Sequence, residues 1–420
     1  MSEILEVFLD GVPAGRLTRT PDGAITFDYA ADAPDTPLSC SLPRHRTHHA
    51  SDVVTPWLDN LLPEKDDVRV RWAQSVGEWR ATPFDLLALL GADCAGAVQI
   101  VPEGRTPADG ARLIPISDAE IGAHLRALKD EAGPAWHVPG SGASWTLGGQ
   151  QAKFTLARGA DGGWTVPSGG APSTHIVKRG LAQFPGSEVA EYATTRAAIL
   201  LGLPVPPVEL VEFAGEIALV TRRFDRIVGD DGTVRRVHQE DLCQAMGLPR
   251  GLKYQMDGGP SPRDVTTFLR RALDPRDRER GVHDFARALV FNWLAAGTDA
   301  HAKNYSVLHV GARAALAPFY DLISAAFLMP DRDVHAEAPL SMQFGGDYRL
   351  ATVDSGRLGE AAADLGVDEG FLVDVARTWR DQLPDAIHTA LVELPPSYTD
   401  DQRADLMDAM AVRLTWVRVP

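Results

Sequence analysis

Three polar residues in the last third of the chain have types and a spacing that suit phosphoryl transfer. Asp299 and Asn304 are spaced as Asp-x-x-x-x-Asn, the pattern in which a kinase loop places a catalytic base and a metal-binding amide. Asp321 lies where a second metal-binding carboxylate is expected, on a following strand. Asp299 can accept a hydroxyl proton, while the other two side chains can hold magnesium between phosphates. Because short motifs are weak, a solvated helix end and loop is the competing interpretation.

The residues before this motif predict the helix that positions it. Residues 285–296 read FARALVFNWLAA, an apolar run typical of a buried helix, and Gly297 ends it. Asp299, His301 and Asn304 follow within a few positions, and such side chains are costly to bury without partners. His301 is a second candidate base, but Asp299 has the required spacing to Asn304.

One upstream lysine is a candidate for binding nucleotide phosphates. Lys178 ends an apolar strand at 174–178, where its ammonium group can act as a point charge on phosphate. The helix predicted at 188–201 offers Glu191, or less readily Glu188, as the carboxylate partner. An edge lysine that extends to solvent is the competing interpretation.

A glycine- and serine-rich segment at 140–149 is a candidate phosphate loop. Gly148, Gly149 and Gln150 precede a predicted strand, and backbone N–H groups in such a turn can bind phosphate. Paired glycines also mark ordinary turns. The segment lacks the Lys-Ser/Thr ending of a Walker loop, so it is not one.

The pattern along the chain changes from β-rich to α-rich. Residues 6–29 predict an antiparallel meander, and a polar stretch with Pro and Gly at 102–109 predicts a boundary. Strands and helices alternate as far as 226, with helices predicted from 116 to about 129 and at 188–201 after the boundary, and beyond 226 the patterns are mostly helical. This order is typical of a two-lobed kinase.

Composition restricts the class of protein. The 420 residues are 45% hydrophobic and 23% charged, which is ordinary for a globular chain. The net charge of −16 argues against broad nucleic-acid binding by the chain itself. Cys40, Cys94 and Cys243 show no disulfide or zinc spacing, and there is no signal peptide or membrane-length apolar run. These features predict a cytoplasmic protein without membrane contact.

Other nucleophile and metal signals are weak. Histidines at positions 45, 48 and 49 lie in a polar stretch, where we expect them to be solvated. The chain has no His-x-x-x-His, no Cys-x-x-Cys and no Gly-x-Ser-x-Gly. A histidine-built metal site and an α/β-hydrolase are therefore disfavoured.

Ordered short motifs give the chain a specific resemblance. They are NLLPE at 60–64, GADCAGA at 91–97, LGGQQAK at 147–153, THIVK at 174–178, EY at 191–192, RFDR at 223–226, HQED at 238–241, KY at 253–254, TDAHAKN at 298–304 and PFYDL at 318–322. In this combination the chain resembles the HipA family, serine/threonine kinases that serve as toxins of type II toxin–antitoxin modules.

The resemblance implies an α+β, two-lobed protein-kinase-like fold. A small β-rich N-terminal subdomain is expected at 1–105, and a kinase N-lobe with the phosphate loop and the ATP lysine at 106–226. A mostly α-helical C-lobe with the catalytic loop is expected at 227–420.

The resemblance also implies roles for individual residues. Asp299 is expected to be the catalytic base, with Asn304 and Asp321 as Mg²⁺ ligands. The residues expected to bind ATP are Lys178, His301, Gln239, Tyr320, Gly148, Gly149, Gln150, the backbone of Arg222 and the ring of Phe224. Family members often carry Glu where this chain has Arg222, but a backbone contact to adenine tolerates that change. Thr146 stands where related kinases phosphorylate a serine of their own phosphate loop.

The function implied is ATP-dependent phosphorylation of a protein, such as an aminoacyl-tRNA synthetase, that restrains translation and growth. The implied partner is a small HipB-like helix-turn-helix antitoxin, with DNA bound only indirectly through it. A catalytically idle corepressor and a small-molecule or lipid kinase on the same fold are the alternatives.

Overall fold

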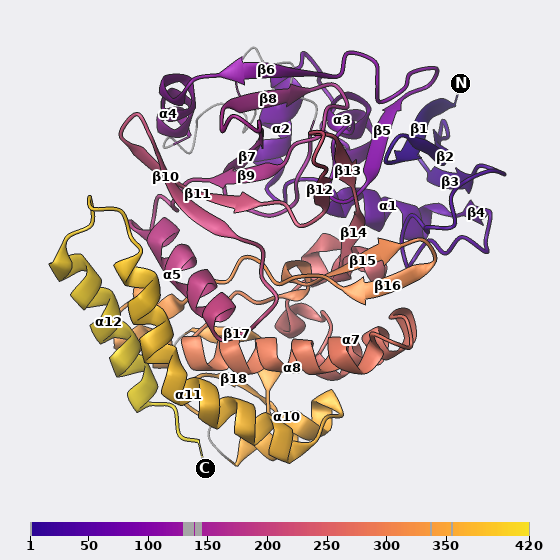
Figure 1. Ribbon diagram of the computed structural model, residues 1–420. Helices are drawn as coiled ribbons and strands as arrows, with labels where there is room; N and C mark the ends of the chain where they lie inside the picture. The colour runs from indigo at the N-terminus through magenta and orange to yellow at the C-terminus, as the bar shows by residue number, and fades with distance from the viewer. Residues whose placement is uncertain (1, 129–137, 139–144, 337, 354–355, 420) are drawn as a thin grey trace. The chain divides into compact units, whose positions relative to one another are not determined.

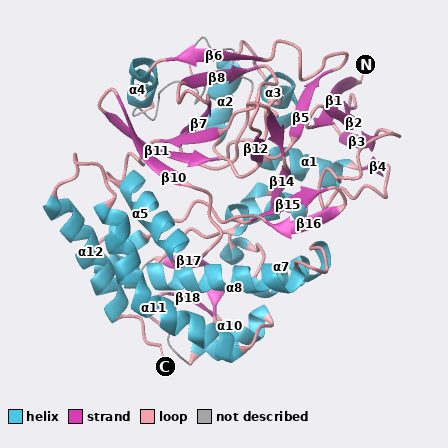
Figure 2. Cartoon of the chain, in the orientation of Figure 1, coloured by secondary structure: helices cyan, strands magenta, loops and turns pink. Residues whose placement is uncertain are grey.

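The chain forms two compact units, both visible in the computed structural model (Figure 1). Residues 2–128, 138, 145–336, 338–353 and 356–419 are described. Unit 1 comprises Met1–Arg179, Glu212–Arg250 and Val307–Ala314, and unit 2 comprises Gly180–Val211, Gly251–Ser306 and Ala315–Pro420. Strands dominate unit 1 and helices dominate unit 2 (Figure 2).

The N-terminal part of unit 1 is an antiparallel sheet with three helices. Its strands have the order β4-β3-β2-β1-β5: β1 (Glu3–Leu9), β2 (Val12–Arg19), β3 (Ile25–Tyr29), β4 (His48–His49) and β5 (Val98–Pro102). The helices are α1 (Ser51–Asn60), α2 (Asp66–Ser75) and α3 (Pro83–Leu90). Alternating burial along β3 shows that one face covers the core. The predicted meander at 6–29 is confirmed.

A second, six-stranded sheet carries the candidate phosphate-binding residues. Its order is β10-β11-β9-β7-β8-β6: β6 (Arg112–Ile116), β7 (Lys153–Arg158), β8 (Trp164–Ser168), β9 (His175–Lys178), β10 (Val208–Phe213) and β11 (Glu216–Arg222). α4 (Asp118–Ala127) begins with a capping box between Ser117 and Glu120. The first part of the predicted glycine-rich loop, 140–144, lies outside the described residues.

The segment after 226 contains strands that the sequence patterns did not predict. β12 (Arg226–Val228) pairs with β13 (Val234–Arg236), and β14 (His238–Asp241), β15 (Ser306–Val310) and β16 (Arg313–Leu316) form a three-stranded sheet. In this segment, where the patterns predicted mostly helix, the only helix before residue 250 in the described chain is the short α6 (Leu242–Ala245). These strands are too short for their periodicity to be recognised.

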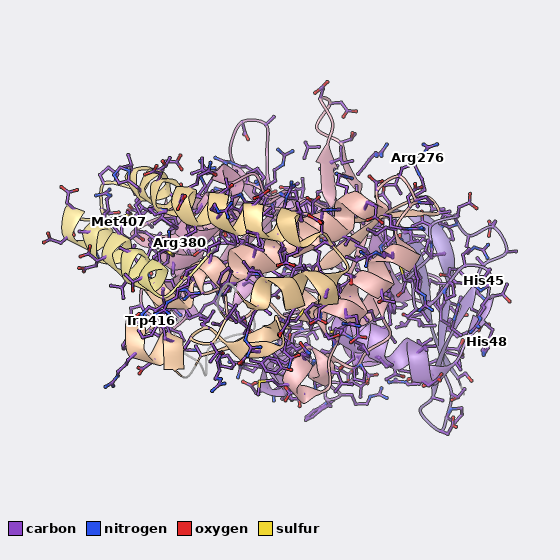
Figure 3. The ribbon with its side chains drawn as sticks, turned by 90° about the horizontal axis from the view of Figure 1, so that it is seen from below. His45, His48, Arg276, Arg380, Met407 and Trp416 are labelled. Carbon is purple, nitrogen blue, oxygen red and sulfur yellow. The ribbon has the colours of Figure 1, made fainter. Side chains whose placement is uncertain are left out.

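Unit 2 is built around α8, whose length is mostly buried. Its helices are α5 (Ser187–Leu200), α7 (Pro262–Ala272), α8 (Arg278–Ala295), α9 (Asp331–Ala336), α10 (Arg357–Leu365), α11 (Glu369–Val392) and α12 (Asp400–Thr415). β17 (Pro339–Phe344) and β18 (Asp347–Arg349) form a hairpin. α7, α11 and α12 pack on α8. Arg380 on α11 contacts the segment that follows α12: its Nε donates to the carbonyl of Val417 at 3.1 Å. Figure 3 labels Arg380 and Trp416, the residue before Val417.

Candidate active site

The catalytic-loop residues lie in unit 2, directly after α8. Ala296 takes a left-handed conformation with φ 57° and ends the helix. At Gly297 an added Cβ would come within 2.4 Å of Asn292 Oδ1, so a side chain there would force Asn292 to move. The left-handed conformation of Ala296 turns the backbone out of the buried helix, and the missing side chain of Gly297 leaves room for Asn292. Asp299 is exposed, as a base that receives a proton from a bound substrate must be.

Asn304 holds the catalytic loop in shape. Its Nδ2 donates to the backbone oxygen of Asp299 at 2.8 Å, and its backbone N–H donates to the His301 carbonyl at 2.9 Å. The amide nitrogen is thus occupied within the loop, which leaves Oδ1 as the atom suited to a metal ion. The loop is also attached to a residue outside it, because the Ala302 N–H donates to the carbonyl of Lys253 at 3.1 Å. His301 itself is buried.

Tyr254 is a site residue that the sequence reasoning noted only as part of a family motif. Its hydroxyl donates a hydrogen bond to Asp299 Oδ1 at 2.8 Å. The hydroxyl of a kinase substrate, which receives the phosphoryl group, makes the same type of contact with the catalytic base. Its ring meets the His301 ring edge-on with centroids 5.0 Å apart, and Lys253 Nζ lies 4.9 Å from the Tyr254 centroid. The sequence contains Tyr254 in the Lys-Tyr motif at 253–254, but no local pattern relates this motif to Asp299, which is distant in the sequence.

Asp321 lies after β16 in an irregular segment, so its predicted place on a strand is wrong. Its φ is 55°, a conformation uncommon for a non-glycine residue and often found at functional sites. α5 anchors the residues that follow: Thr195 Oγ1 donates to the Leu322 carbonyl at 3.3 Å, and Thr194 Oγ1 accepts from the Ser324 N–H at 3.1 Å. This anchoring supports the unusual backbone at Asp321.

Tyr320 ties this segment to the catalytic loop within unit 2. Its hydroxyl donates to the Lys303 carbonyl at 2.8 Å and lies 2.6 Å from Ser306 Oγ. The hydroxyl therefore fixes the spacing between the loop and the segment that carries Asp321.

In unit 1, Lys178 has a second lysine beside it. Lys178 and Lys153 are directly paired across β9 and β7, which places their side chains on one face of the sheet. Both are buried. Like charges opposite one another in a sheet are unfavourable, and an anion such as phosphate would offset their repulsion. The Lys153 ammonium also packs against Gly149, where an added Cβ would lie 2.6 Å from Nζ.

The N-terminal segment holds the candidate phosphate loop. Gly149 (φ 103°) bridges to Pro63 and accepts from the Glu64 N–H at 3.1 Å. Gln150 Nε2 donates to Glu64 Oε2 at 3.0 Å. The motif at 60–64 thus serves to fix this turn.

Thr146 is fully buried at the start of the described part of this loop. Its N–H donates to the Asp93 carbonyl at 3.2 Å and its hydroxyl to Cys94 Sγ at 3.3 Å. The neighbouring Trp145 meets Trp72 edge-on at 5.7 Å. In this arrangement the Thr146 hydroxyl is inaccessible, so its phosphorylation requires the loop to leave its place.

A buried ion cluster supports the same loop, and sequence reasoning did not identify it. Asp93 Oδ1 accepts from Arg226 Nη2 at 2.9 Å and Arg236 Nη2 at 3.0 Å. Asp225 pairs with Arg223 at 2.7 Å and Arg226 at 2.9 Å. Burial alone would raise the pKa of Asp93, but the surrounding arginines hold that pKa well below its usual range. Both carboxylates are therefore ionised at neutral pH.

The remaining predicted nucleotide residues also lie in unit 1. Arg222 ends β11, where it pairs with His175, and Phe224 follows two positions later. Gln239 is partly exposed on β14. Their proposed contacts to ATP stay predictions.

The histidines of the 45–49 stretch do not share one environment. His48 is exposed, and its Nδ1 lies 2.8 Å from Asp28 Oδ1. His49, by contrast, is buried on β4, where it pairs with Phe27 of β3. The expectation that all three are solvated is therefore wrong for His49. Figure 3 shows His45 and His48 on the outside of the N-terminal sheet.

The predicted site residues thus form two groups. Unit 2 contains Asp299, His301, Asn304, Tyr320 and Asp321, and unit 1 contains Thr146, Gly148, Gly149, Gln150, Lys178, Arg222, Phe224 and Gln239. Glu191 is buried on α5 of unit 2, and its pairing with Lys178 stays a prediction.

Comparisons with known proteins identify the class. A solved chain of the complex of Shewanella oneidensis HipA and HipB with operator DNA matches with a TM-score of 0.82 and 25% identity, covering 98% of this chain and 96% of that one. The chain therefore has the mixed helix-and-sheet, two-lobed kinase-like fold. The HipA-like C-terminal domain family matches residues 145–387, and the HipA N-terminal domain family matches residues 5–101. The chain belongs to the HipA family.

Two curated relatives span nearly the same length. Y4mE of Sinorhizobium fredii, named as a candidate kinase, is 33% identical and covers 99% of each chain. The serine/threonine-protein kinase toxin HipA of Shewanella oneidensis is 28% identical over 90% of this chain and 89% of its own. Among the described helices, none is long and apolar enough to cross a membrane.

Proposed function

We propose that this chain is an ATP- and Mg²⁺-dependent serine/threonine protein kinase. The observation that carries the proposal is the loop after α8, in which Asn304 braces the backbone of Asp299 while a hydroxyl group donates to the Asp299 carboxylate at 2.8 Å. A carboxylate so placed can accept the proton of a serine or threonine hydroxyl as its oxygen attacks the γ-phosphoryl group.

The donor set fits the proposed cofactor. Asn304 Oδ1 and the Asp321 carboxylate are the hard oxygen ligands that Mg²⁺ prefers. Lys178 and Lys153, paired across two strands, supply positive charge for phosphate oxygens. When bound, the ion neutralises charge that develops on the phosphates. The protein's own residues position the acceptor and take up its proton.

The wider role follows from the family. The protein substrate is a component whose phosphorylation restrains translation and growth, with an aminoacyl-tRNA synthetase as the first to test. The partner is a HipB-like helix-turn-helix antitoxin in the cytoplasm, which carries the contact with operator DNA. The solved HipA–HipB–DNA complex of the relative supports this partner, and the net charge of −16 suits a chain that leaves DNA binding to another protein.

Phosphoryl transfer by Asp299→Asn tests the proposal. The amide retains the shape of the carboxylate but cannot accept a proton, so transfer of labelled γ-phosphate to protein should fall by about 10²-fold or more. ATP affinity and thermal unfolding should stay close to wild type. Asp405→Asn, an exposed substitution on α12, is the matched control and should retain full transfer.

The same experiment separates the alternatives. Full label incorporation by Asp299→Asn would remove Asp299 from the role of base. A wild-type chain that binds antitoxin but transfers no phosphate would be a corepressor. Transfer to a small molecule or lipid, with none to protein, would define the third class.

A further inference from the structure

A second group of potential metal ligands lies in unit 1, and none of its residues is among those assigned to ATP or Mg²⁺. Cys40, Glu240 and His309 each offer one ligand atom, and these atoms all lie within 4.8 Å of one another. His309 Nε2 is 2.8 Å from Glu240 Oε1. The three residues come from the irregular segment before β4, from β14 and from β15, so only the fold brings them together.

The group is held in place before any ion arrives. The Tyr29 hydroxyl accepts from the Leu38 N–H at 2.6 Å and donates to the Leu42 carbonyl at 2.6 Å, which fixes the turn that carries Cys40. The Cys40 N–H itself donates to Glu240 Oε1 at 2.8 Å. Such a rigid framework reduces the ordering cost of binding an ion.

A second layer of contacts surrounds the ligands. The rings of His238 and His309 stack with centroids 5.1 Å apart, and His238 Nε2 lies 3.0 Å from the Leu38 carbonyl. Ser39 Oγ donates to Glu240 Oε2. Metal ligands in proteins are commonly oriented by outer contacts of this kind.

Glu240 supplies negative charge at this position. It is fully buried, and burial alone would raise the pKa of its carboxyl. The hydrogen bonds from His309 and Ser39 outweigh burial, and the pKa of Glu240 is lowered from its usual value. The carboxylate is therefore present at neutral pH as an anionic ligand atom next to an imidazole and a thiol.

We propose that Cys40, Glu240 and His309 form a binding site for a divalent transition-metal ion of the Zn²⁺ type. Sulfur, imidazole nitrogen and carboxylate oxygen are the ligand atoms that Zn²⁺ takes, whereas Mg²⁺ and Ca²⁺ select oxygen alone. Cys40 is partly exposed, and a water molecule would complete the tetrahedral coordination of the ion.

Binding requires a small adjustment and a defined loss of protons. Tetrahedral Zn²⁺ with bonds of about 2.0–2.3 Å brings its ligand atoms to roughly 3.3–3.8 Å of one another, so the widest pair must close by about 1 Å. The Cys40 thiol releases its proton to solvent and forms the Zn–S bond. His309 binds the ion through Nε2, which carries no proton in the bound state, and its remaining proton lies on Nδ1. Affinity should therefore rise with pH.

Titration of the full, reduced chain with Co²⁺ tests the site. Co²⁺ is a coloured substitute for Zn²⁺, and a Cys ligand gives a thiolate-to-metal charge-transfer band. We expect one equivalent to produce this band together with the visible bands of a tetrahedral ion, and Zn²⁺ should displace both. Excess Mg²⁺ should displace neither, because the site contains sulfur and nitrogen.

Variants assign the ligands. Cys40→Ser should remove the charge-transfer band, and His309→Gln should weaken Co²⁺ binding at least tenfold. Cys243→Ala, which removes a different buried thiol, is the matched control and should titrate as wild type. Asp321→Ala should also leave the band unchanged, which separates this site from the proposed Mg²⁺ site. Absence of stoichiometric Co²⁺ binding by the wild-type chain, or a full band in Cys40→Ser, would overturn the proposal.

Discussion

Asp93→Asn is a substitution for which the structure predicts a large loss of stability in unit 1. Asp93 is almost fully buried and faces three guanidinium groups, with Arg226 at 2.9 Å, Arg236 at 3.0 Å and Arg223 at 3.7 Å. Its Oδ2 also accepts from Ser173 Oγ at 2.6 Å. Asparagine retains the shape but removes the charge and directs N–H groups at other N–H donors.

The size of the predicted stability loss follows from the charge imbalance that remains in the buried cluster. After the substitution, Asp225 would still pair with Arg223 and Arg226, whereas Arg236 would keep only the more distant carboxylate of Asp10, at 3.9 Å, among its described ion pairs. Removing one partner of a buried ion pair typically costs about 3–5 kcal/mol, because the remaining charge stays buried without compensation. A domain has a total stability of about 5–15 kcal/mol, so unit 1 should lose a large part of its free energy of unfolding.

The same contacts predict an acid dependence. Although burial raises it, the pKa of Asp93 is held below its unfolded value of about 3.9 by the arginines. A carboxyl group with a depressed folded pKa contributes stability that is complete above the unfolded pKa and is lost as pH falls toward the folded pKa. Wild type should therefore lose stability steadily below about pH 4. The Asn variant should lack that part of the slope.

Urea unfolding followed by tryptophan fluorescence measures both effects. Trp72 and Trp145 are buried in unit 1 and contact each other, and Trp145 precedes Thr146, which donates to the Asp93 carbonyl. Their fluorescence therefore reports on the folding of the region around Asp93. Asp32→Asn, in an exposed turn, is the control. A loss below about 1 kcal/mol, or an acid slope equal to that of wild type, would refute the assignment of Asp93 as the centre of the cluster.

The other predictions concern the proposed kinase site. Asp321→Ala should weaken Mg·ATP binding measured by calorimetry, and unchanged affinity would move the metal site elsewhere. Tyr254→Phe should raise the rate of acceptor phosphorylation several-fold without changing the KM for ATP, because it removes a hydroxyl that competes for Asp299; a loss of activity would instead make Tyr254 a positioning residue. Thr146→Ala should abolish the mass gain of one phosphate after incubation with Mg·ATP, and an identical gain in the variant would direct attention to Ser144 and Ser141.

The helix before the candidate catalytic loop and the polar loop that follows it could be predicted, because their information is local; the catalytic roles stay a prediction. An apolar helix, a glycine and an Asp-x-x-x-x-Asn spacing occupy one short stretch. The left-handed residue that ends the helix is Ala296 and not the predicted Gly297, which instead allows Asn292 to pack closely. Asn304 braces the backbone of Asp299. The backbone at Asp321 was beyond such reasoning, since its positive φ depends on support from α5.

Long-range groups escaped the sequence analysis for a different reason. Asp93 and Arg226 are far apart in the chain, and each is an ordinary charged residue in its own segment. Cys40 likewise shows no zinc spacing, because its neighbours Glu240 and His309 arrive on β14 and β15, two strands that local periodicity did not predict. Single-sequence patterns report periodicity and turns, but they do not report which segments pair.

The N-terminal segment supports the candidate phosphate loop. Asp93 uses its carboxylate for the arginine cluster and its backbone oxygen for the Thr146 N–H, while Glu64 binds both Gly149 and Gln150. The described part of the loop is therefore held at Thr146 and at Gly149 and Gln150 by residues of the HipA N-terminal family region. A weakening of either attachment favours departure of the loop, since the hydroxyl of Thr146 is exposed only when they release. In the proposed kinase, the stability of the N-terminal segment and the binding of phosphate by this loop would be coupled through the same few contacts.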